Sequence, residues 1–545
     1  MKDYLRSIIS DSLKQFDLSD EDRPKEIEIE KPNQPDHGDA ATNIAMMLAR
    51  PLRNNPRKIA EQIVENLDYD PKRIAEVEIA GPGFINFRYA DTYLYDELAE
   101  ILLLATDFGK TNHREGQKLQ VEFVSANPTG PLTVGHGRNA VLGDTIARLL
   151  EWTGAKVDRE YYFNNAGRQM RVLGESVRAR YLQELGKDVE FPEDGYQGEY
   201  IKEIAAALIE EQDDALVDSE DVTPFKDKAE ALIFEEIQKT LNRMNIKMDR
   251  FFNERELYED GSIDRAVETF REKGLAYEKE GATWFKTSEF GKDKDTVLIK
   301  STGEPTYRMP DIAYHANKLD RGYDQCIDIF GADHIATYPD VMSGIEALGY
   351  DPSKIDVVVY QFVTLVNKGK PFKMSTRKAN FVTLDELMDE VGSDITRFFF
   401  LMRDPNTHLE FDIAEAKEEG EKNPVFYLQY AHARIKSILR KVEEEYSFES
   451  EPNLEVLTHP AEIQLVKTMI RFPEMIESAA EAREPHRLIN YLNDLASDFT
   501  TFYHDCRILG EAEELVQARA DLAKAVAQVL ANGLGILGIS APDQM

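Results

Sequence analysis

A strand, a turn and a helix start follow one another in segment 121–143, which reads VEFVSANPTGPLTVGHGRNAVLG. The hydrophobic run 119–124 predicts a buried strand, and the apolar positions after the turn predict a helix. Gly135, His136 and Gly137 stand where that helix should begin. Backbone N–H groups and the positive end of the helix dipole bind anions at such a position, and an imidazole adds a donor. The segment therefore predicts a phosphate site.

The common glycine-rich phosphate loops do not match this turn, because neither the GxxxxGK[ST] nor the GxGxxG spacing is present. The turn resembles instead the HxGH signature of class I aminoacyl-tRNA synthetases. The flanking phrases SANPTGPL and GRNAVLGD are similar to the arginyl-tRNA synthetase form of that signature. One position departs from the family, since Thr133 stands where the first histidine of the signature falls. Threonine donates one hydrogen bond but is never cationic, so we expect a weaker but working ATP site.

A basic segment further along the chain resembles the second signature of the same family. Residues 368–378, KGKPFKMSTRK, are similar to the family's KMSK loop in its arginyl form. No acidic residue lies between Val357 and Leu384, although the chain has a formal net charge of −36. Cationic side chains stabilise the charge that builds on a pyrophosphate leaving group. Taken alone, the segment is equally consistent with a solvated basic hairpin.

The resemblance implies which residues carry the nucleotide chemistry. The catalytic residues that it implies are His136, Lys373, Arg377 and Lys378. The ATP-binding residues that it implies are Thr133, Gly135, His136, Gly137, Asp333, His334, Met374 and Ser375. Mg²⁺ is expected to accompany ATP and to offset phosphate charge, and the sequence shows no metal-ligand cluster for a separate ion.

An arginine substrate presents a guanidinium with five donors, and a carboxylate accepts two of them at once. Asp311 is the best candidate acceptor, and Tyr307 lies four residues earlier, on the same face of a helical turn. The alternative is that Asp311 only caps a helix, and without the resemblance that alternative is favoured. By resemblance, Glu122 and Asn127 hold the α-amino and carboxylate groups. The full set implied for arginine is Glu122, Ser125, Asn127, Tyr307, Asp311 and His334.

Composition limits the class of protein. With 545 residues and 42% hydrophobic side chains, the chain is long enough for roughly three or four domains with true cores. No apolar run reaches the length that crosses a bilayer, and the amphipathic start lacks the apolar core of a signal peptide. Its two cysteines cannot build a thiolate zinc site. We expect a cytoplasmic monomer without membrane contact.

The excess of acid, 101 Asp and Glu against 65 Lys and Arg, opposes binding to RNA, which needs local positive surface. The basic residues are segregated, however, because segment 422–441 holds five of them and no acid. Adaptation to high salt is the other explanation that the composition leaves open. We assign most of the aromatic-apolar stripe of this segment to the core: Phe426, Tyr427, Leu428 and Tyr430. The residues predicted to bind tRNA are Gln429, Arg434, Lys436 and Arg440.

The pattern of strands and helices predicts three units. Residues 1–110 suit a small α+β domain, which in the resembled family contacts the tRNA elbow. Residues 111–404 alternate strands and helices, which predicts an α/β Rossmann-like catalytic domain with a parallel sheet and a helical insertion at about 170–290. Residues 405–545 are almost entirely helical and resemble the family's all-α anticodon-binding bundle. The strand candidates of the sheet are 119–124, 156–161, 326–330 and 355–362.

By the resemblance to this family, these features imply arginine–tRNA ligase activity. The expected substrates are ATP, L-arginine and tRNA(Arg), and the expected intermediate is arginyl-adenylate, which the 2′-hydroxyl of the terminal adenosine attacks. Three alternatives are a nucleotidylyltransferase, a catalytically weak or silent tRNA-binding relative, and a class I synthetase for another amino acid. The helical end argues against the first, the intact KMSTRK segment against the second, and the acidic pocket candidates against the third.

Overall fold

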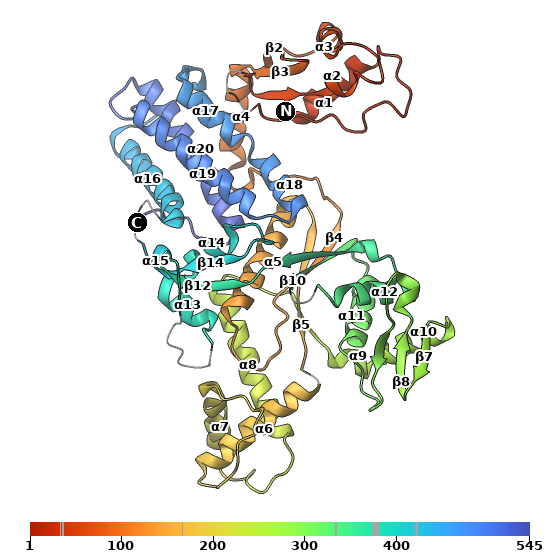
Figure 1. The fold of residues 1–545 in the computed structure, drawn as a ribbon. Coiled ribbons are helices and arrows are strands. Elements are labelled where there is room, and N and C mark those ends of the chain that lie inside the picture. The colour runs from red at the N-terminus through yellow and green to blue at the C-terminus, as the bar shows by residue number, and fades with distance from the viewer. Residues whose placement is uncertain are drawn as a thin grey trace.

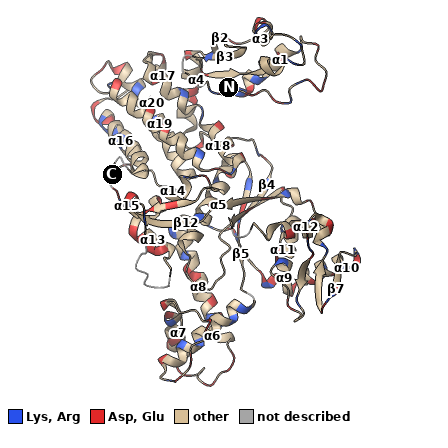
Figure 2. Cartoon of the chain, viewed as in Figure 1, with Lys and Arg blue, Asp and Glu red and all other residues tan. Residues whose placement is uncertain are grey.

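The computed structural model describes residues 1–545 apart from 33, 35–36, 166, 333–334, 373–380, 419 and 421–422. Figure 1 shows a central sheet with the helical C-terminal unit on one side and two smaller lobes on the other, and the N-terminal unit at the far end. Among the described residues, no helix combines the length and the apolar character needed to cross a membrane. Acidic side chains are spread over every unit rather than gathered in one (Figure 2).

The N-terminal unit is a three-stranded antiparallel sheet with short helices packed on it, which confirms the predicted α+β character. Its strands are β1 (Ala40–Thr42), β2 (Ile74–Ala80) and β3 (Phe84–Tyr89), in the order β1-β3-β2. Its helices are α1 (Lys2–Leu13), α2 (Ile44–Met47) and α3 (Pro56–Glu65), whose apolar faces form one core with the sheet. Helix α4 (Asp91–Leu104) and the 3₁₀ turn η2 (Ala105–Asp107) lead to the next unit.

A five-stranded parallel sheet forms the centre of the molecule, as predicted. Its strands are β4 (Lys118–Glu122), β5 (Lys156–Phe163), β6 (Arg250–Asn253), β10 (Gln325–Gly331) and β11 (Ile355–Tyr360). Their order is β11-β10-β4-β5-β6, and every pairing is parallel. Strand β6 was not predicted, because a run of four residues is too short for a hydrophobic period to identify.

The strand order reverses between β4 and β10. From β4 the chain proceeds to β5 and β6 on one side, and it returns to β10 and β11 on the other. In open α/β sheets, ligands bind outside the carboxyl ends of the strands at such a reversal. We call the region at the carboxyl ends of β4 and β10 the crevice. Helix α5 (Val134–Trp152) starts there and is buried along most of its length.

The predicted helical insertion consists of two different lobes. The first is helical and holds α6 (Gly167–Glu184), α7 (Glu199–Gln212) and α8 (Thr223–Arg243). After β6 come α9 (Arg255–Glu259) and α10 (Ser262–Glu272), and then an antiparallel sheet of β7 (Ala276–Lys279), β8 (Ala282–Phe285) and β9 (Thr296–Ile299), with the 3₁₀ turn η3 (Thr287–Phe290) before β9.

This sheet differs from the prediction of helix up to about residue 290. Two residues, Glu280 and Gly281, connect β7 to β8, and both have positive φ, +54° and +76°. A two-residue turn of that kind matches the twist of a β-hairpin. The aromatic and β-branched residues on either side then pair as strands rather than continuing a helix.

Two helices and a small second sheet complete the catalytic unit. Helix α11 (Arg308–Asp320) precedes β10, while α12 (Tyr338–Leu348) and the 3₁₀ turn η5 (Pro352–Lys354) precede β11. The second sheet is formed by β12 (Val363–Asn367), β13 (Lys370–Pro371) and β14 (Leu409–Asp412). Helices α13 (Leu384–Val391) and α14 (Ser393–Leu401) lie between β13 and β14 in the sequence, and α15 (Ile413–Ala416) follows.

The C-terminal unit is an all-α bundle, as predicted. It consists of α16 (Pro424–Glu445), the 3₁₀ turn η6 (Leu454–Val456), α17 (Pro460–Met469), α18 (Phe472–Ala482), α19 (His486–Asp505) and α20 (Glu513–Ile536). Its buried side chains belong to the same hydrophobic core as those of α5 and the central sheet. The bundle is therefore packed onto the catalytic unit.

Candidate active site

The first signature forms the start of helix α5. Thr133 is the N-cap residue: its Oγ1 accepts a hydrogen bond from the His136 N–H at 3.4 Å, and His136 Nδ1 accepts one from the Thr133 N–H at 3.1 Å. This is a capping box in which histidine replaces the usual Glu or Gln. The residue that departs from the family, Thr133, therefore has a structural function, because threonine is a favourable N-cap.

The same bond leaves His136 ready to donate from its other ring nitrogen. Because Nδ1 accepts a backbone N–H, the neutral ring carries its proton on Nε2. Burial lowers the pKa of His136, which favours that neutral form. Among the residues that the structure describes, Nε2–H has no acceptor, and a neutral imidazole at a helix N-terminus is suited to donate to a phosphate oxygen.

The two glycines of the signature have different surroundings. The Gly135 N–H lies in the open first turn and donates to no other group in the described part of the chain. The Gly137 N–H donates to Thr133 O at 3.1 Å. A β-carbon at Gly137 would lie 2.6 Å from Leu384 Cδ1 and 2.8 Å from Phe400 Cε2. Glycine at this position thus lets α5 pack closely against α13 and α14, whereas Gly135 offers a free donor.

The second signature falls mostly outside the described residues. Lys373, Met374, Ser375, Arg377 and Lys378 are among those that the structure does not describe. The chain that follows them pairs directly with the start of α5. Thr383 and Thr133 form an antiparallel bridge, and the Leu384 N–H donates to Leu132 O at 2.8 Å. The described flank of the basic segment therefore lies beside His136.

The turn between β4 and α5 has a strained backbone. Val124 and Ser125 have φ values of +67° and +41°, a conformation that is costly for a β-branched residue such as valine. Asn139 of α5 holds this turn in place: its Oδ1 accepts from the Val124 N–H at 2.6 Å, and its Nδ2 donates to Ile329 O of β10 at 2.8 Å. One amide thus links both strands of the crevice, and the sequence offered no pattern that identified it.

Carboxylates from three different elements influence one another at the crevice. Glu122 ends β4, Asp311 belongs to α11 and Glu254 lies just before α9. Burial raises the pKa of Asp311 to about 7; His315 opposes the rise, and the charges of Glu122 and Glu254 reinforce it. Such a concentration of negative charge favours a cationic ligand over an empty site, because the ligand relieves the repulsion.

Asp311 does not cap its helix. Helix α11 begins at Arg308 with Tyr307 at the N-cap position, so Asp311 lies inside the helix and the alternative of an N-cap is wrong. The Tyr307 side chain is 73% exposed, whereas Asp311 is only partly exposed. The two residues therefore lie at different depths, although they are one helical turn apart.

Of the other residues predicted to bind arginine, Ser125 contacts Glu122, whereas Asn127 lies at the surface. Ser125 Oγ donates to Glu122 Oε1 at 2.9 Å and accepts from the Tyr162 N–H at 3.1 Å. Asn127 is exposed, and its Nδ2 donates to Gln169 Oε1 at 2.6 Å. Asp333 and His334 lie outside the described residues.

Glu254 acts electrostatically on Asp311, and the sequence prediction did not include it. It is buried, and its Oε2 accepts from Tyr162 Oη at 2.6 Å. Burial raises the pKa of Glu254 as well. The ring of Tyr162 packs against that of Tyr314 with 4.4 Å between centroids, so aromatic rings line this side of the crevice. In the acid-rich segment around Glu254 no local signal distinguishes one carboxylate from its neighbours.

A resident metal ion does not fit the buried carboxylates. Glu122, His315 and Asp328 are close enough to form a ligand set. Lys318 Nζ donates both to Glu122 Oε2 and to Asp328 Oδ1, the latter at 2.6 Å, so an ammonium group already takes the cation's place. The Mg²⁺ expected with ATP would therefore bind to the nucleotide as its counter-ion and not to these carboxylates.

Helix α16 differs from the prediction at two neighbouring positions. Gln429, expected to face RNA, is buried, and its Nε2 donates to Asp394 Oδ2 at 2.9 Å and to Ser540 O at 3.0 Å. Tyr430, expected in the core, is 44% exposed. The reason is that the C-terminal tail and α14 pack on the face that holds Gln429, which helical periodicity alone does not reveal.

The basic residues of α16 lie beside an aromatic groove. The Arg434 guanidinium stands 4.2 Å from the ring centre of Tyr503. Lys436 Nζ is 3.6 Å from Asp543 Oδ1, and Arg440 Nη1 donates to Asp543 O at 3.3 Å. The groove is lined by Tyr427, Tyr430, Ala431, Arg434, Phe499 and Thr500.

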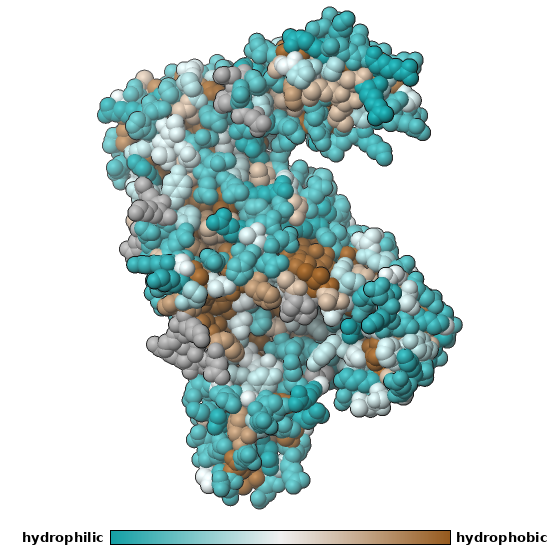
Figure 3. All heavy atoms as spheres, in the orientation of Figure 1, coloured by the Kyte–Doolittle hydropathy of each residue, from teal (hydrophilic) through white to brown (hydrophobic). Residues whose placement is uncertain are grey.

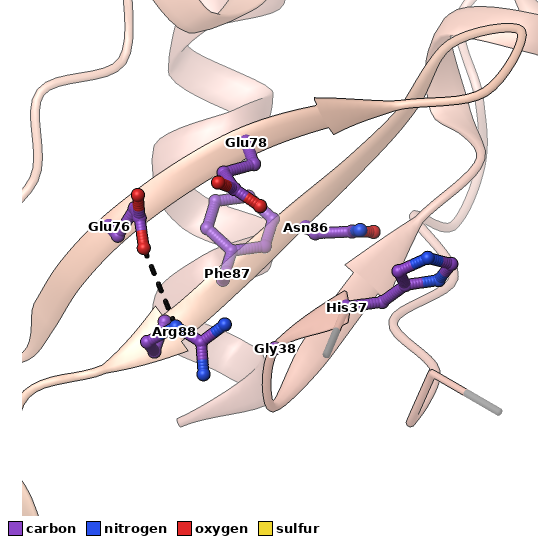
Figure 4. A pocket seen from close by; sticks show the side chains of 7 residues that line it. All are labelled: His37, Gly38, Glu76, Glu78, Asn86, Phe87 and Arg88. Carbon is purple, nitrogen blue, oxygen red and sulfur yellow. Dashed lines mark ion pairs between the residues drawn. The ribbon is translucent and has the colours of Figure 1, made fainter. Parts of the chain in front are cut away.

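A separate pocket lies on the N-terminal sheet (Figure 4). It is lined by His37, Gly38, Glu76, Glu78, Asn86, Phe87 and Arg88. Glu76 and Arg88 form an ion pair at 3.5 Å across its floor. In the space-filling view a deep notch separates this unit from the catalytic unit (Figure 3). The pocket is therefore distinct from the crevice at β4 and β10.

Comparison with protein families reproduces the order of the three units. The family described as "tRNA synthetases class I (R), catalytic domain" matches residues 97–409. "Arginyl tRNA synthetase N terminal domain" matches residues 3–89, and "DALR anticodon binding domain" matches residues 428–545. The central match alone spans more than half of the chain, so the protein is a class I aminoacyl-tRNA synthetase.

Individual relatives show which synthetase of this class the chain resembles in sequence and in length. The arginine–tRNA ligase of Salinibacter ruber is 55% identical over 564 aligned residues, which cover 100% of both chains. The arginine–tRNA ligase of Desulfotalea psychrophila is 52% identical over 95% of this chain and 94% of its own. The chain belongs to the arginyl-tRNA synthetases. The Thermus thermophilus arginyl-tRNA synthetase structure shares the fold, with a TM-score of 0.78 over all of both chains at 23% identity.

Proposed function

We propose that the crevice between β4 and β10 activates L-arginine with ATP and transfers it to tRNA(Arg). The observation that supports this most directly is the meeting of three features at one place. Buried carboxylates suit a doubly cationic amino acid, the start of α5 offers donors to phosphate, and the flank of the basic segment pairs with Thr133. A class I synthetase needs these three functions side by side.

Asp311 and Glu254 are proposed to bind the guanidinium group of arginine. Both carboxylates are held in an environment that disfavours their charge, and a guanidinium removes that penalty by pairing with them. Glu122 and Ser125 are proposed to bind the α-ammonium group and Asn127 the carboxylate group, and Tyr307 and His334 are proposed to complete the arginine site. The exposed Tyr307 side chain is free to change its orientation for that purpose.

ATP is proposed to place its phosphates at the Gly135 N–H and at His136 Nε2, with Thr133 and Gly137 shaping the turn. The arginine carboxylate oxygen attacks the α-phosphorus, the bond to the bridging oxygen breaks, and pyrophosphate leaves. Lys373, Arg377 and Lys378 offset the charge on pyrophosphate, while Met374, Ser375, Asp333 and His334 contact the nucleotide. Positioning and electrostatics carry this step.

The adenylate then reacts with tRNA(Arg). The 2′-oxygen of the terminal adenosine attacks the arginyl carbonyl carbon and forms the ester bond. The bond between that carbon and the phosphate oxygen of AMP breaks, and AMP leaves with the electron pair of that bond. Arg434, Lys436 and Arg440 are proposed to contact tRNA together with the exposed Tyr430, whereas the buried Gln429 holds the C-terminal tail. The N-terminal unit, within 1–110, is proposed to contact the elbow.

The remaining proposals concern the whole protein. We propose domain boundaries near residues 110 and 404, Mg²⁺ bound with ATP, a monomeric enzyme and a cytoplasmic location. The proposed substrate is tested by aminoacylation of total tRNA with each of the twenty amino acids in turn. Arginine alone should be attached; attachment of another amino acid, or of none, would contradict the proposal.

The basic segment gives the first prediction. Lys373→Ala should lower the rate of arginine-dependent pyrophosphate exchange by at least about 100-fold, as for loss of one transition-state donor, and should leave the Kd for arginine unchanged. Lys370→Ala is the matched control, because Lys370 is an exposed lysine of the same basic sequence segment. Equal rates for the two variants would show that Lys373 has no catalytic role.

A further inference from the structure

Two carboxylates lie directly opposite each other on neighbouring strands of the crevice. Glu122, the last residue of β4, is in register with Asp328 of β10, and both side chains are buried. Like charges opposite each other in a sheet repel and destabilise the pairing. The sheet therefore needs a counter-charge at this point.

Lys318 of α11 supplies the counter-charge. Its ammonium group donates to both carboxylates, and its side chain has no exposed surface. The group also lies 4.5 Å from the ring centre of Tyr314. Burial by itself would lower the pKa of Lys318, but Asp328 and Glu122 raise it above its usual range. Lys318 is therefore a permanently charged side chain inside the protein.

Asp328 has a second partner that Glu122 lacks. His315 Nε2 lies 2.8 Å from Asp328 Oδ2, and His315 Nδ1 lies 2.7 Å from Asp311 O. Both ring nitrogens of His315 therefore face oxygen atoms of the protein. Asp328 is thus held from two sides within the protein. It belongs to the support of the site rather than to its ligand-facing surface.

Glu122 is held in a different way. Its Oε2 accepts from Lys318, and its Oε1 accepts from Ser125 Oγ in the strained turn at 2.9 Å. One contact on each oxygen fixes the plane of the carboxylate. Each carboxylate oxygen accepts about two hydrogen bonds, so Glu122 keeps acceptor capacity for a ligand.

We propose that Lys318 is a positioning residue that orients Glu122 to receive the α-ammonium group of arginine. This inference rests on the proposed role of Glu122 in arginine binding. Lys318 does not touch the substrate; it acts by holding the Glu122 carboxylate in one orientation through its hydrogen bond. The guanidinium group is bound elsewhere, by Asp311 and Glu254. Lys318 should therefore affect ligands that carry an α-ammonium group and spare those that lack it.

The test compares arginine with 5-guanidinopentanoate, which differs from arginine only by lacking the α-amino group. Binding of each ligand to the full chain is measured by calorimetry. Lys318→Met should weaken arginine binding by about 10- to 100-fold, the effect of one lost charged hydrogen bond, and change analogue binding by less than about twofold. Arg321→Met is the matched control, since Arg321 lies on the same side of the sheet and pairs with Glu160 at 2.8 Å. It should leave the affinity ratio of the two ligands unchanged.

The double variant Lys318→Met/Asp328→Asn removes one charge of each sign, so it serves where the single variant fails to fold. It should show the same selective loss of arginine binding. Equal weakening of both ligands, or undiminished arginine binding, would overturn the proposal. Failure of the proposed role of Glu122 has a separate signature: Glu122→Gln would then leave the affinity ratio of arginine to analogue at the wild-type value.

Discussion

At the scale of single residues, Asp311 lies close to the midpoint between its protonated and charged forms at neutral pH. Asp311 has a pKa of about 7, because burial and the charges of Glu122 and Glu254 outweigh the favourable charges of His315 and Lys318. A carboxylate with this pKa is partly protonated at neutral pH. Binding of a guanidinium pulls it towards the charged form, so substrate binding and proton release are linked.

This linkage predicts a pH-dependent KM for arginine. Lowering the pH from 8 to 6 protonates Asp311 and should raise the KM by about tenfold for a single group of pKa near 7. The variant Asp311→Asn should have a high KM, raised by an amount equivalent to about 2–5 kcal/mol, with little change between pH 6 and 8. Steady-state aminoacylation at several pH values measures both effects. A wild-type KM that is flat over this range would rule out Asp311 as the guanidinium acceptor.

Ionisation of Asp311 favours arginine binding but lowers the stability of the free protein. The folded-state pKa is raised above the unfolded value, so the free energy of unfolding falls as pH rises from about 4 through 7. Asp311→Asn should therefore stabilise the free protein at pH 8, by up to about 4 kcal/mol, and change it little at pH 4. Thermal unfolding without arginine measures this difference. A less stable variant at pH 8 would mean that the carboxylate is not desolvated in the free protein.

At the scale of the element, the start of α5 depends on its capping box. Thr133 and His136 satisfy each other's backbone N–H groups, and the same bond fixes the tautomer of His136. The N-terminus of the helix and His136, the proposed phosphate donor, therefore form one structural unit. The threonine that departs from the family signature supports this unit through its hydroxyl.

Thr133→Ala is predicted to weaken this unit. Loss of the N-cap oxygen should lower the free energy of unfolding by about 1 kcal/mol and raise the KM for ATP in pyrophosphate exchange. Thr133→Ser keeps the oxygen and is the control that should behave as the wild type. If alanine and serine gave equal stability and equal KM values, the cap would have no part in holding His136.

At the scale of the whole molecule, one buried arginine joins the C-terminal unit to two parts of the catalytic unit. Arg397 of α14 donates from Nε to Leu537 O at 2.8 Å, from Nη1 to Met244 O at 2.6 Å and from Nη2 to Asp144 Oδ2 at 2.7 Å. These acceptors lie after α20, after α8 and within α5. Gly538 has φ +72°, and a β-carbon there would lie 2.3 Å from Arg397 Cζ. The helical bundle therefore closes tightly over the guanidinium.

Arg397→Met is predicted to loosen the joint between these units. Removing one partner of a buried charge pair should lower the free energy of unfolding by about 3 kcal/mol, because two carbonyl groups lose their donor and Asp144 keeps only its contacts with Arg148 and Arg159. Arg243→Met is the control, since Arg243 pairs with Asp389 at the surface and should contribute less than about 1 kcal/mol. Thermal melting of both variants measures the difference. Equal melting temperatures would show that Arg397 does not hold the units together.

Local patterns of the sequence predict much of this architecture. The run 119–124 forms β4, His136 stands in the first turn of α5, and the last unit is helical, because each feature depends on residues within one or two turns of one another. The hairpin at Glu280 and Gly281 was missed, since the acid-rich helical pattern before it masked the turn.

The sequence by itself therefore determined the class of fold and the family, and it predicted the position of the phosphate site, since short motifs carry these features. Only the tertiary structure decided that Glu254 joins Asp311, that Lys318 lies between Glu122 and Asp328, and that Gln429 is buried. These contacts join residues far apart in the chain. The physical reason is that charge pairing and burial depend on distance in space, which no local period of the sequence encodes.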